Sequence, residues 1–117
     1  MFASEPLRAY PPLEAGKGRV FIYRSSMIGG EFSSPEALLN GAKVGKLNRR
    51  VVYFRDVPPG SYAVTTTLTS AVVHFSMREG EKKYVRLNSS LLQSKLLPEI
   101  VDPAAGEAET AGLPRVF

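Results

Sequence analysis

The chain carries few of the residue types that perform chemistry. His74 is its one histidine, and cysteine is absent, which excludes disulfides and metal sites built from several imidazoles or thiolates. The alternation of apolar residues points His74 away from the expected core, where an imidazole could act as a general base or a pH-sensitive contact. Catalysis would also need a nucleophile, and no motif ties Ser70 or Ser76 to this imidazole. We therefore interpret His74 as a surface histidine.

The strongest charge pattern is a basic segment, 37–55, that contains no acidic residue. Its five cations form a candidate anion-binding or partner-binding site: Lys43, Lys46, Arg49, Arg50 and Arg55. Positive charge concentrated in this way could hold an anionic lipid surface, a nucleic acid, a phosphorylated glycan or an acidic protein. Nucleic acid is the least favoured, because the aromatic side chains are not interleaved with the cations as stacking platforms. The simpler interpretation is a solvated hairpin whose lysines discourage pairing of sheet edges.

For the other polar side chains, a structural role is a simpler interpretation than a binding role. Thr65, Thr67 and Thr69 form a hydroxyl row that could bind a glycan or a partner strand, but threonine is also a favoured strand residue. Four tyrosines could line a sugar-binding face, although packing is their more usual role: Tyr23, Tyr53, Tyr62 and Tyr84. The carboxylates show no spacing that predicts a pair for acid–base catalysis. The sequence thus predicts no catalytic residue, no metal ligand and no cofactor.

Composition limits the chain to one domain. A length of 117 residues is enough for a single hydrophobic core without disulfides. Fifteen basic and eleven acidic side chains give a net charge of +4, which attracts anionic partners weakly and selects none of them. No apolar run reaches the ~18 residues of a membrane span, and the first residues lack the pattern of a secretory signal. These features fit a cytoplasmic protein, or an envelope protein whose leader has been replaced by Met1.

Two turn signals predict a small all-β fold. Asn40-Gly41 is the preferred centre of a type I′ hairpin turn, because both residues accept positive φ at little cost. Pro58-Pro59-Gly60 ends one strand, since proline has no N–H to donate, and redirects the chain into the next. Together with apolar alternation, these signals predict about seven or eight short strands: 19–24, 36–39, 43–47, 51–55, 61–69, 71–77, 82–87 and 96–101.

We expect these strands to form an antiparallel β-sandwich or barrel. Strand 19–24 is apolar on both faces at its centre, as expected in the middle of such a fold. Strand 36–39 and the strand that contains Pro98 are the expected sheet edges. The inward-facing side chains of the two alternating strands are Tyr62, Val64, Thr66, Leu68, Ala71, Val73, Phe75 and Met77.

The ends of the chain are expected to lie outside the sandwich. Prolines and charged residues in 1–17 predict a flexible N-terminal tether, followed by the β-sandwich domain over 18–103. Asp102 and Pro103 have the residue types of a helix N-cap and first helical position. The C-terminal tail, 104–117, is therefore expected to contain a short helix.

Four segments, in this order, resemble the bacterial family known as domain of unknown function 2846. They are Gly18–Arg24, Leu39–Leu47, Val57–Tyr62 and Gly80–Arg86. The likeness spans about residues 15–103 and implies a sandwich of the transthyretin or carboxypeptidase-regulatory kind. It also implies a location in the periplasm or cell envelope, where members are made with a signal peptide and often carry a lipid anchor. The family supplies no catalytic or ligand-binding residue to carry over.

These observations together favour a non-enzymatic envelope module. We expect it to bind an envelope protein or a cell-wall component through a loop or an exposed strand edge. The alternative is that the basic hairpin binds an anionic lipid or a nucleic acid. A hydrolase that acts through His74 is the weakest hypothesis.

Overall fold

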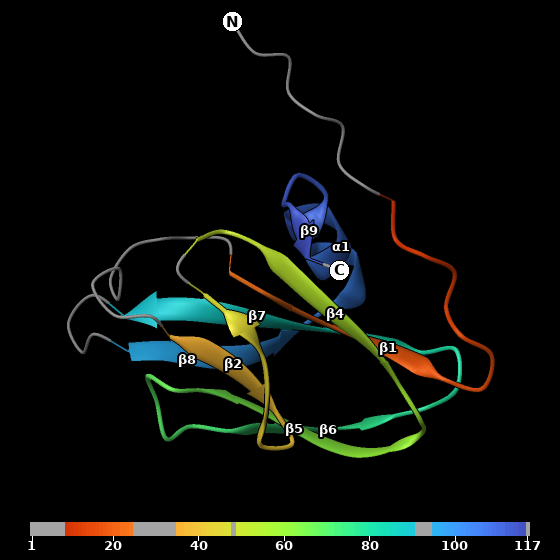
Figure 1. Ribbon diagram of the computed structural model, residues 1–117, viewed down its shortest axis with the longest axis horizontal. Helices are drawn as coiled ribbons and strands as arrows, with labels where there is room; N and C mark the ends of the chain where they lie inside the picture. Colours follow the sequence, from red (N-terminus) through yellow and green to blue (C-terminus); the bar gives the residue numbers. More distant parts are fainter. Residues whose placement is uncertain (1–8, 25–34, 48, 91–94, 117) are drawn as a thin grey trace, which may run out of the picture.

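Two β-sheets pack face to face, and a short helix lies on the far side of one of them (Figure 1). This computed structural model describes residues 9–24, 35–47, 49–90 and 95–116. Sheet A has the strand order β8-β7-β1-β4-β9, and sheet B the order β3-β2-β5-β6. The elements are β1 (Gly18–Tyr23), β2 (Glu36–Leu39), β3 (Ala42–Lys46), β4 (Val52–Val57), β5 (Gly60–Thr66), β6 (Val73–Met77), β7 (Lys82–Ser90), β8 (Lys95–Val101), α1 (Pro103–Thr110) and β9 (Arg115–Val116).

The predicted all-β, two-sheet architecture is confirmed, but sheet A is mixed rather than antiparallel. β1 pairs with β7 in parallel, and β4 pairs with β9 in parallel. The chain leaves sheet A after β4, builds β5 and β6 in sheet B, and returns to place β7 beside β1. Such a pairing between distant segments leaves no local signal in the sequence. The two-residue strand β9 was not predicted either.

The Asn40-Gly41 turn has the predicted type I′ character, with φ of 50° and 80° at its two residues. Asn40 also fastens the hairpin to β5, because its Oδ1 accepts from Ala63 N at 2.8 Å and its N donates to Ala63 O at 2.8 Å. β2 consequently lies between β3 and β5. The expectation that 36–39 forms an edge is wrong, since β3 takes that position; the expectation for the strand with Pro98, β8, is confirmed.

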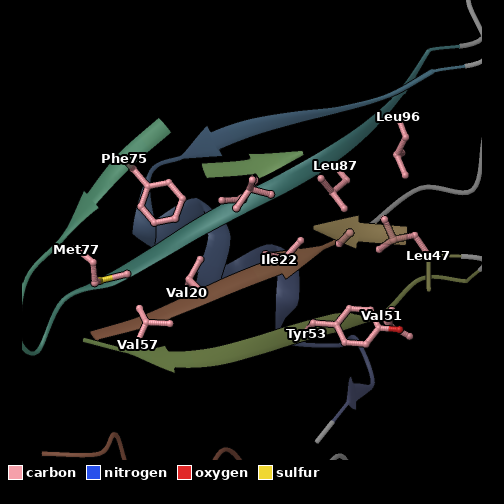
Figure 2. Packing of buried hydrophobic residues seen from close by; sticks show 13 residues of the cluster. Val20, Ile22, Leu47, Val51, Tyr53, Val57, Phe75, Met77, Leu87 and Leu96 are labelled. Carbon is pink, nitrogen blue, oxygen red and sulfur yellow. The ribbon is translucent and has the colours of Figure 1, made fainter. Parts of the chain in front are cut away.

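The main core lies between the two sheets, as Figure 2 shows. Val20 and Ile22 of β1 point into it, and Phe75 and Met77 of β6 meet them from sheet B. The predicted inward faces of β5 and β6 are confirmed at their buried positions, Val64, Thr66, Phe75 and Met77. Ala71 differs: it is exposed, because β6 begins only at Val73.

Sheet A is covered on its outer face as well, so that β1 is buried along its whole length. Phe21 and Tyr23 point to this outer face, where they form a second cluster with Val52 and Tyr84. Tyr10 from the N-terminal segment packs on the cluster, with its ring 5.2 Å from the ring of Phe21. Burial of both faces explains why the centre of the strand, residues 20–23, is a continuous apolar run.

α1 begins as predicted and supplies much of this cover. The Asp102 carboxylate caps it by accepting from the backbone N–H groups of Ala104 and Ala105, and Pro103 occupies the first turn. Gly106 faces the Tyr84 ring so closely that a Cβ there would lie 2.3 Å from the Cγ of Tyr84. Described residues of both expected ends, 9–17 and 104–116, thus contact sheet A; residues 1–8 and 117 lie outside the described part. No helix among the described residues is long and apolar enough to cross a bilayer.

The substitution Gly106→Ala tests whether α1 packs on sheet A. Alanine is the better helix residue by ~1 kcal/mol, yet we expect Gly106→Ala to lower the free energy of unfolding by ~1–3 kcal/mol, because the added methyl group displaces the helix from Tyr84. Urea unfolding followed by far-UV circular dichroism measures the change. Gly112→Ala is the control, since nothing lies within 4 Å of its added Cβ. Equal effects of the two substitutions would contradict the packing of α1.

Candidate functional site

β6 forms an open edge of sheet B, and the hydrogen bonds of its neighbour show which backbone groups face outward. Both backbone groups of Ala63 on β5 are directed toward Asn40, away from β6. A residue in an antiparallel strand directs its N–H and C=O to the same side, so Ala63 and its partner His74 form a non-hydrogen-bonded pair. The N–H and C=O of His74 therefore point to the open edge, and so do those of Ser76, two residues further along.

The side chains along this edge alternate between solvent and core. His74 and Ser76 are exposed, whereas Phe75 and Met77 are buried. Val72, just before the strand, is one of two exposed large apolar residues in the described part of the chain, at 43%. No hydrogen bond between described residues joins His74 to Ser70 or Ser76. The structure therefore places His74 on the surface of an open strand.

The other three sheet edges are protected in different ways. On β3, the register shift between Ala37 and Leu38 leaves a bulge, and the Arg55 guanidinium donates to Val44 O at 2.9 Å. β8 contains Pro98, which has no N–H, and Thr66 Oγ1 from sheet B donates to Leu96 O at 2.7 Å. β9 is only two residues long. Among the described strands, β6 is the edge best suited to accept another strand.

Three of the basic residues singled out in the sequence lie around Tyr53: Arg49 and Arg55 are close enough to act electrostatically on its hydroxyl, which donates to Lys46 O. Lys43 lies 3.7 Å from Glu36, the residue just before the basic segment, and Arg55 donates to backbone oxygens rather than facing solvent freely. Lys46, Arg49 and Arg50 are exposed. Arg50 borders a shallow hollow beside the end of α1, on the outer side of sheet A, whereas Lys43 lies on β3 of sheet B. Lys46, Arg49 and Arg55 thus lie near one another, whereas Arg50 lies toward α1.

The threonine and tyrosine sets are largely occupied by structural hydrogen bonds. Thr65 Oγ1 donates to Ala71 O, while Thr67 and Thr69 accept from backbone N–H groups. The Tyr53 hydroxyl donates to Lys46 O at 2.6 Å, and the Tyr62 hydroxyl donates to Pro58 O. Tyr23 and Tyr84 lie buried against the outer face of sheet A, where burial raises the pKa of both hydroxyls. The four tyrosines therefore share no open face.

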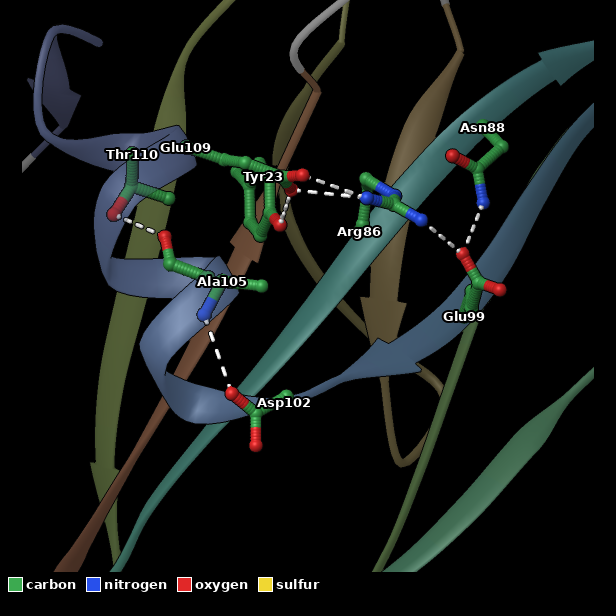
Figure 3. Close-up of polar contacts among 9 residues, drawn as sticks. Tyr23, Arg86, Asn88, Glu99, Asp102, Ala105, Glu109 and Thr110 are labelled. Carbon is green, nitrogen blue, oxygen red and sulfur yellow. Dashed lines mark hydrogen bonds and ion pairs between the residues drawn. The ribbon is translucent and has the colours of Figure 1, made fainter.

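A polar network that the sequence did not predict fixes α1 to sheet A (Figure 3). Arg86 of β7 lies at its centre: its Nη1 is 2.8 Å from Glu109 Oε2 on α1, and its Nη2 is 2.6 Å from Glu99 Oε1 on β8. The Tyr23 hydroxyl of β1 also donates to Glu109, and Asn88 Nδ2 donates to Glu99 Oε1 at 3.0 Å. The network therefore joins β7, β8 and α1 directly through the Arg86 guanidinium, and β1 through Glu109.

The charge states of this network suit a structural role. Hydrogen bonds from Arg86 lower the pKa of Glu99, so that its carboxyl stays ionised. Burial and the Glu109 carboxylate raise the pKa of Tyr23, so that its hydroxyl stays protonated. Both shifts follow from the contacts that hold α1 on the sheet. Glu99 and Glu109 flank the same guanidinium only because α1 docks on the sheet, an arrangement that their sequence spacing does not reveal.

A second ion pair on the outer face holds the N-terminal segment. Arg19 and Asp56 are register partners on β1 and β4, with Nε 2.5 Å from Oδ1 and side chains only 4% and 8% exposed. Arg19 Nη1 also donates to Pro11 O at 2.8 Å, and the backbone N of Glu14 donates to Asp56 Oδ2. Hydrogen bonding from Arg19 lowers the pKa of Asp56. The pair is thus a buried anchor rather than a reactive group.

The fold and these contacts define a two-sheet β-protein in which the described residues contain no cluster of three metal-ligating side chains. The sequence model of the family described as "Protein of unknown function (DUF2846)" matches residues 14–97, and the chain belongs to this family. The match runs from just before β1 into β8, so α1 and Tyr10 lie outside it. Neither the curated proteins nor the solved structures contain a match to this chain.

Asp56→Asn tests the buried anchor through its pH dependence. At about pH 7 we expect a loss of ~2–4 kcal/mol in the free energy of unfolding, because Arg19 keeps a buried charge without its counter-ion. The pKa of Asp56 is lower in the folded than in the unfolded protein. Its stabilising contribution is therefore complete above the unfolded pKa and is lost as the pH falls through the folded pKa.

The difference in the free energy of unfolding between the wild-type protein and the Asp56→Asn variant should accordingly shrink as the pH is lowered from about 7 to about 3. Urea unfolding across this range measures it. Glu79→Gln is the control, since Glu79 is exposed and has no ion pair within the described residues. A difference that stays constant with pH would show that the Asp56 charge does not stabilise the fold.

Proposed function

We propose that this protein is a non-enzymatic binding module of the bacterial envelope that captures an extended segment of a partner protein along β6. The observation that carries the proposal is the open edge of sheet B, where the N–H and C=O of His74 and Ser76 face outward. An added strand satisfies such groups with its own main chain, which gives affinity with little demand on the partner's sequence.

The side chains beside the edge supply the selectivity. A peptide bound along β6 places alternate side chains next to exposed His74 and Ser76, and the others toward the rim of the core near Phe75. We expect a preference for β-branched or aromatic residues at the positions that face the rim, since these pack best against a neighbouring strand. The five residues of β6 allow only a few main-chain hydrogen bonds, so binding is expected to be moderate.

The envelope location and the transthyretin or carboxypeptidase-regulatory kind of sandwich are parts of the same proposal. Both are supported by what members of this family have in common, and an envelope protein is the partner that fits this location. Fractionation of cells that express the complete gene tests the location, with periplasmic and cytoplasmic marker proteins as controls. Recovery with the cytoplasmic marker alone would contradict it.

Proline at position 76 tests strand addition without removing a ladder bond between β5 and β6. Ser76→Pro deletes an N–H that faces the open edge, so the variant should fold like the wild-type protein. Short peptides selected from a displayed random library against the wild-type protein should bind Ser76→Pro about tenfold more weakly or not at all. Ser76→Ala keeps the N–H and is the matched control; it should bind as the wild-type protein does.

The same peptides should shift the amide resonances of His74 and Ser76 in the wild-type protein. Selection of peptides that bind Ser76→Pro as tightly as Ser76→Ala would contradict strand addition at β6.

The alternative function, in which basic residues hold an anionic lipid or a nucleic acid, has a different signature. It predicts salt-sensitive retention on anionic vesicles or DNA that is lost when Lys43, Lys46, Arg49 and Arg50 are all replaced by serine.

A further inference from the structure

The open edge of β6 is short and has a sharp end. Within the five residues of this strand, the N–H and C=O of His74 and Ser76 face outward. The next residue that could continue the row is Arg78, but the turn after the strand already uses both of its backbone groups. Arg78 N donates to Glu81 Oε1 at 3.0 Å, and Arg78 O accepts from Glu81 N at 3.1 Å. A strand added at this edge must therefore satisfy His74 and Ser76.

We propose that a second copy of this chain pairs with the edge, β6 against β6 in antiparallel orientation, around a two-fold axis at Phe75. His74 of each copy then lies opposite Ser76 of the other. Each of these two pairs exchanges both of its main-chain hydrogen bonds, so every outward-facing group of β6 is satisfied. The inference rests on the same open edge as the proposed function, but it names the occupant of that edge when no partner segment is bound.

The register with Phe75 on the axis is the one that the described contacts favour. A two-fold axis at Ser76 would place His74 opposite Arg78, whose backbone groups are already used within the turn. An axis at His74 would place Ser76 opposite Val72, which lies before the strand begins, and would set the two imidazoles against each other. The axis at Phe75 uses the residues of β6 alone.

The side chains of β6 complement themselves in this register. On the face that points into the core, Phe75 lies opposite Phe75 of the second copy, and Val73 lies opposite Met77. On the solvent face, His74 lies opposite Ser76. Apolar side chains thus meet apolar ones and polar side chains meet polar ones. A strand whose polarity is symmetric about its centre suits both sides of a two-fold interface, which is why we name a second copy as the occupant.

Exposed apolar side chains lie next to the edge. Val72 and Ile100 are the two exposed large apolar residues in the described part of the chain, at 43% and 39%. Val72 directly precedes β6. Ile100 of β8 lies opposite Val85, a core residue, so it points to the same side of sheet A, where β8 contacts β6. The edge therefore has an apolar border, and β6 itself contains none of the lysines that commonly protect open strands.

Self-pairing of this kind ends at a dimer and is weak. A two-fold contact uses the same edge of both copies, and the other described strand edges are protected, so no further copy can add. The contact is short, and we expect a dissociation constant of about 0.1–1 mM. A partner segment that binds along β6 must displace the second copy. Self-pairing therefore covers the edge at high protein concentration until a partner segment is captured.

Sedimentation velocity and NMR of the full 117-residue chain test the self-pairing, over a roughly hundredfold range of concentration that reaches about 1 mM. We expect the average mass to rise from that of a monomer toward that of a dimer. The amide resonances of His74 and Ser76 should shift with concentration, whereas that of Lys43, on the opposite edge of sheet B, should not. A selected peptide that binds along β6 should return the protein to a monomer.

Isotope-filtered NMR on a mixture of labelled and unlabelled wild-type protein tests the register. Two residues opposite each other on the axis, as a pair without mutual hydrogen bonds, have Cα atoms ~4.5 Å apart. We therefore expect a cross-peak between the Phe75 Hα protons of the two copies. An axis at His74 would instead pair Phe75 with Val73, and an axis at Ser76 would pair Phe75 with Met77. This measurement needs no variant.

Ser76→Pro separates self-pairing from peptide capture by the size of its effect. The lost N–H removes one hydrogen bond from a peptide complex but two from the symmetric dimer, because both copies carry the substitution. Peptide affinity is expected to fall about tenfold, so self-association should fall about a hundredfold. Ser76→Ala keeps the N–H and should dimerise as the wild-type protein does.

The outcomes distinguish this inference from the proposed function. A protein that stays monomeric at about 1 mM and yet binds selected peptides along β6 would overturn self-pairing alone. A dimer that forms through β6 while no selected peptide binds there would support self-pairing and contradict peptide capture. Self-pairing is also overturned if the filtered spectrum lacks the cross-peak between the two Phe75 residues, or if Ser76→Pro dimerises as strongly as Ser76→Ala.

Discussion

Burial of β1 on both faces is the constraint on which the rest of the structure depends. One face of this strand carries Val20 and Ile22 into the core between the sheets, and the other carries Phe21 and Tyr23 into the cluster under α1. Neither sheet B nor the helix could cover both faces alone. The molecule therefore has three layers, as Figure 1 shows, with sheet A in the middle. The ion pair of Arg19 with Asp56 and the network around Arg86 lie on the outer face, where they hold the N-terminal segment and α1 in place.

Because the helix and the N-terminal segment pack on sheet A, the open strand edge lies in sheet B. Sheet A is covered on both faces, and its terminal strands are either very short or interrupted by proline, whereas β6 ends sheet B with outward-facing backbone groups. On the outer face, Arg19 is paired with Asp56, and Arg86 is paired with Glu99 and Glu109. The recognition proposed for this protein rests on the outward-facing main-chain groups of β6.

The features that the sequence predicted correctly are local ones. Asn40-Gly41 and Asp102-Pro103 set their own backbone geometry, and the alternation through Val64, Phe75 and Met77 reports burial directly. The features that it missed depend on pairing between distant segments: the parallel neighbours β1 and β7, the internal position of β2, and the ion pairs of Arg19 and Arg86. The apolar run of 19–24 did indicate two buried faces. The prolines of 9–17 and the many alanines and glycines of 104–116 gave no sign that these segments provide the second cover.

The most direct test of this account is the accessibility of the Phe21 and Tyr84 rings to a soluble paramagnetic agent, measured by NMR relaxation of their ring protons. The account predicts weak relaxation, comparable to that of Val20 and Ile22 in the main core and far below that of exposed His74. Relaxation of the two rings as strong as that of His74 would mean that the outer face of sheet A is open to water, and would contradict the three-layer structure.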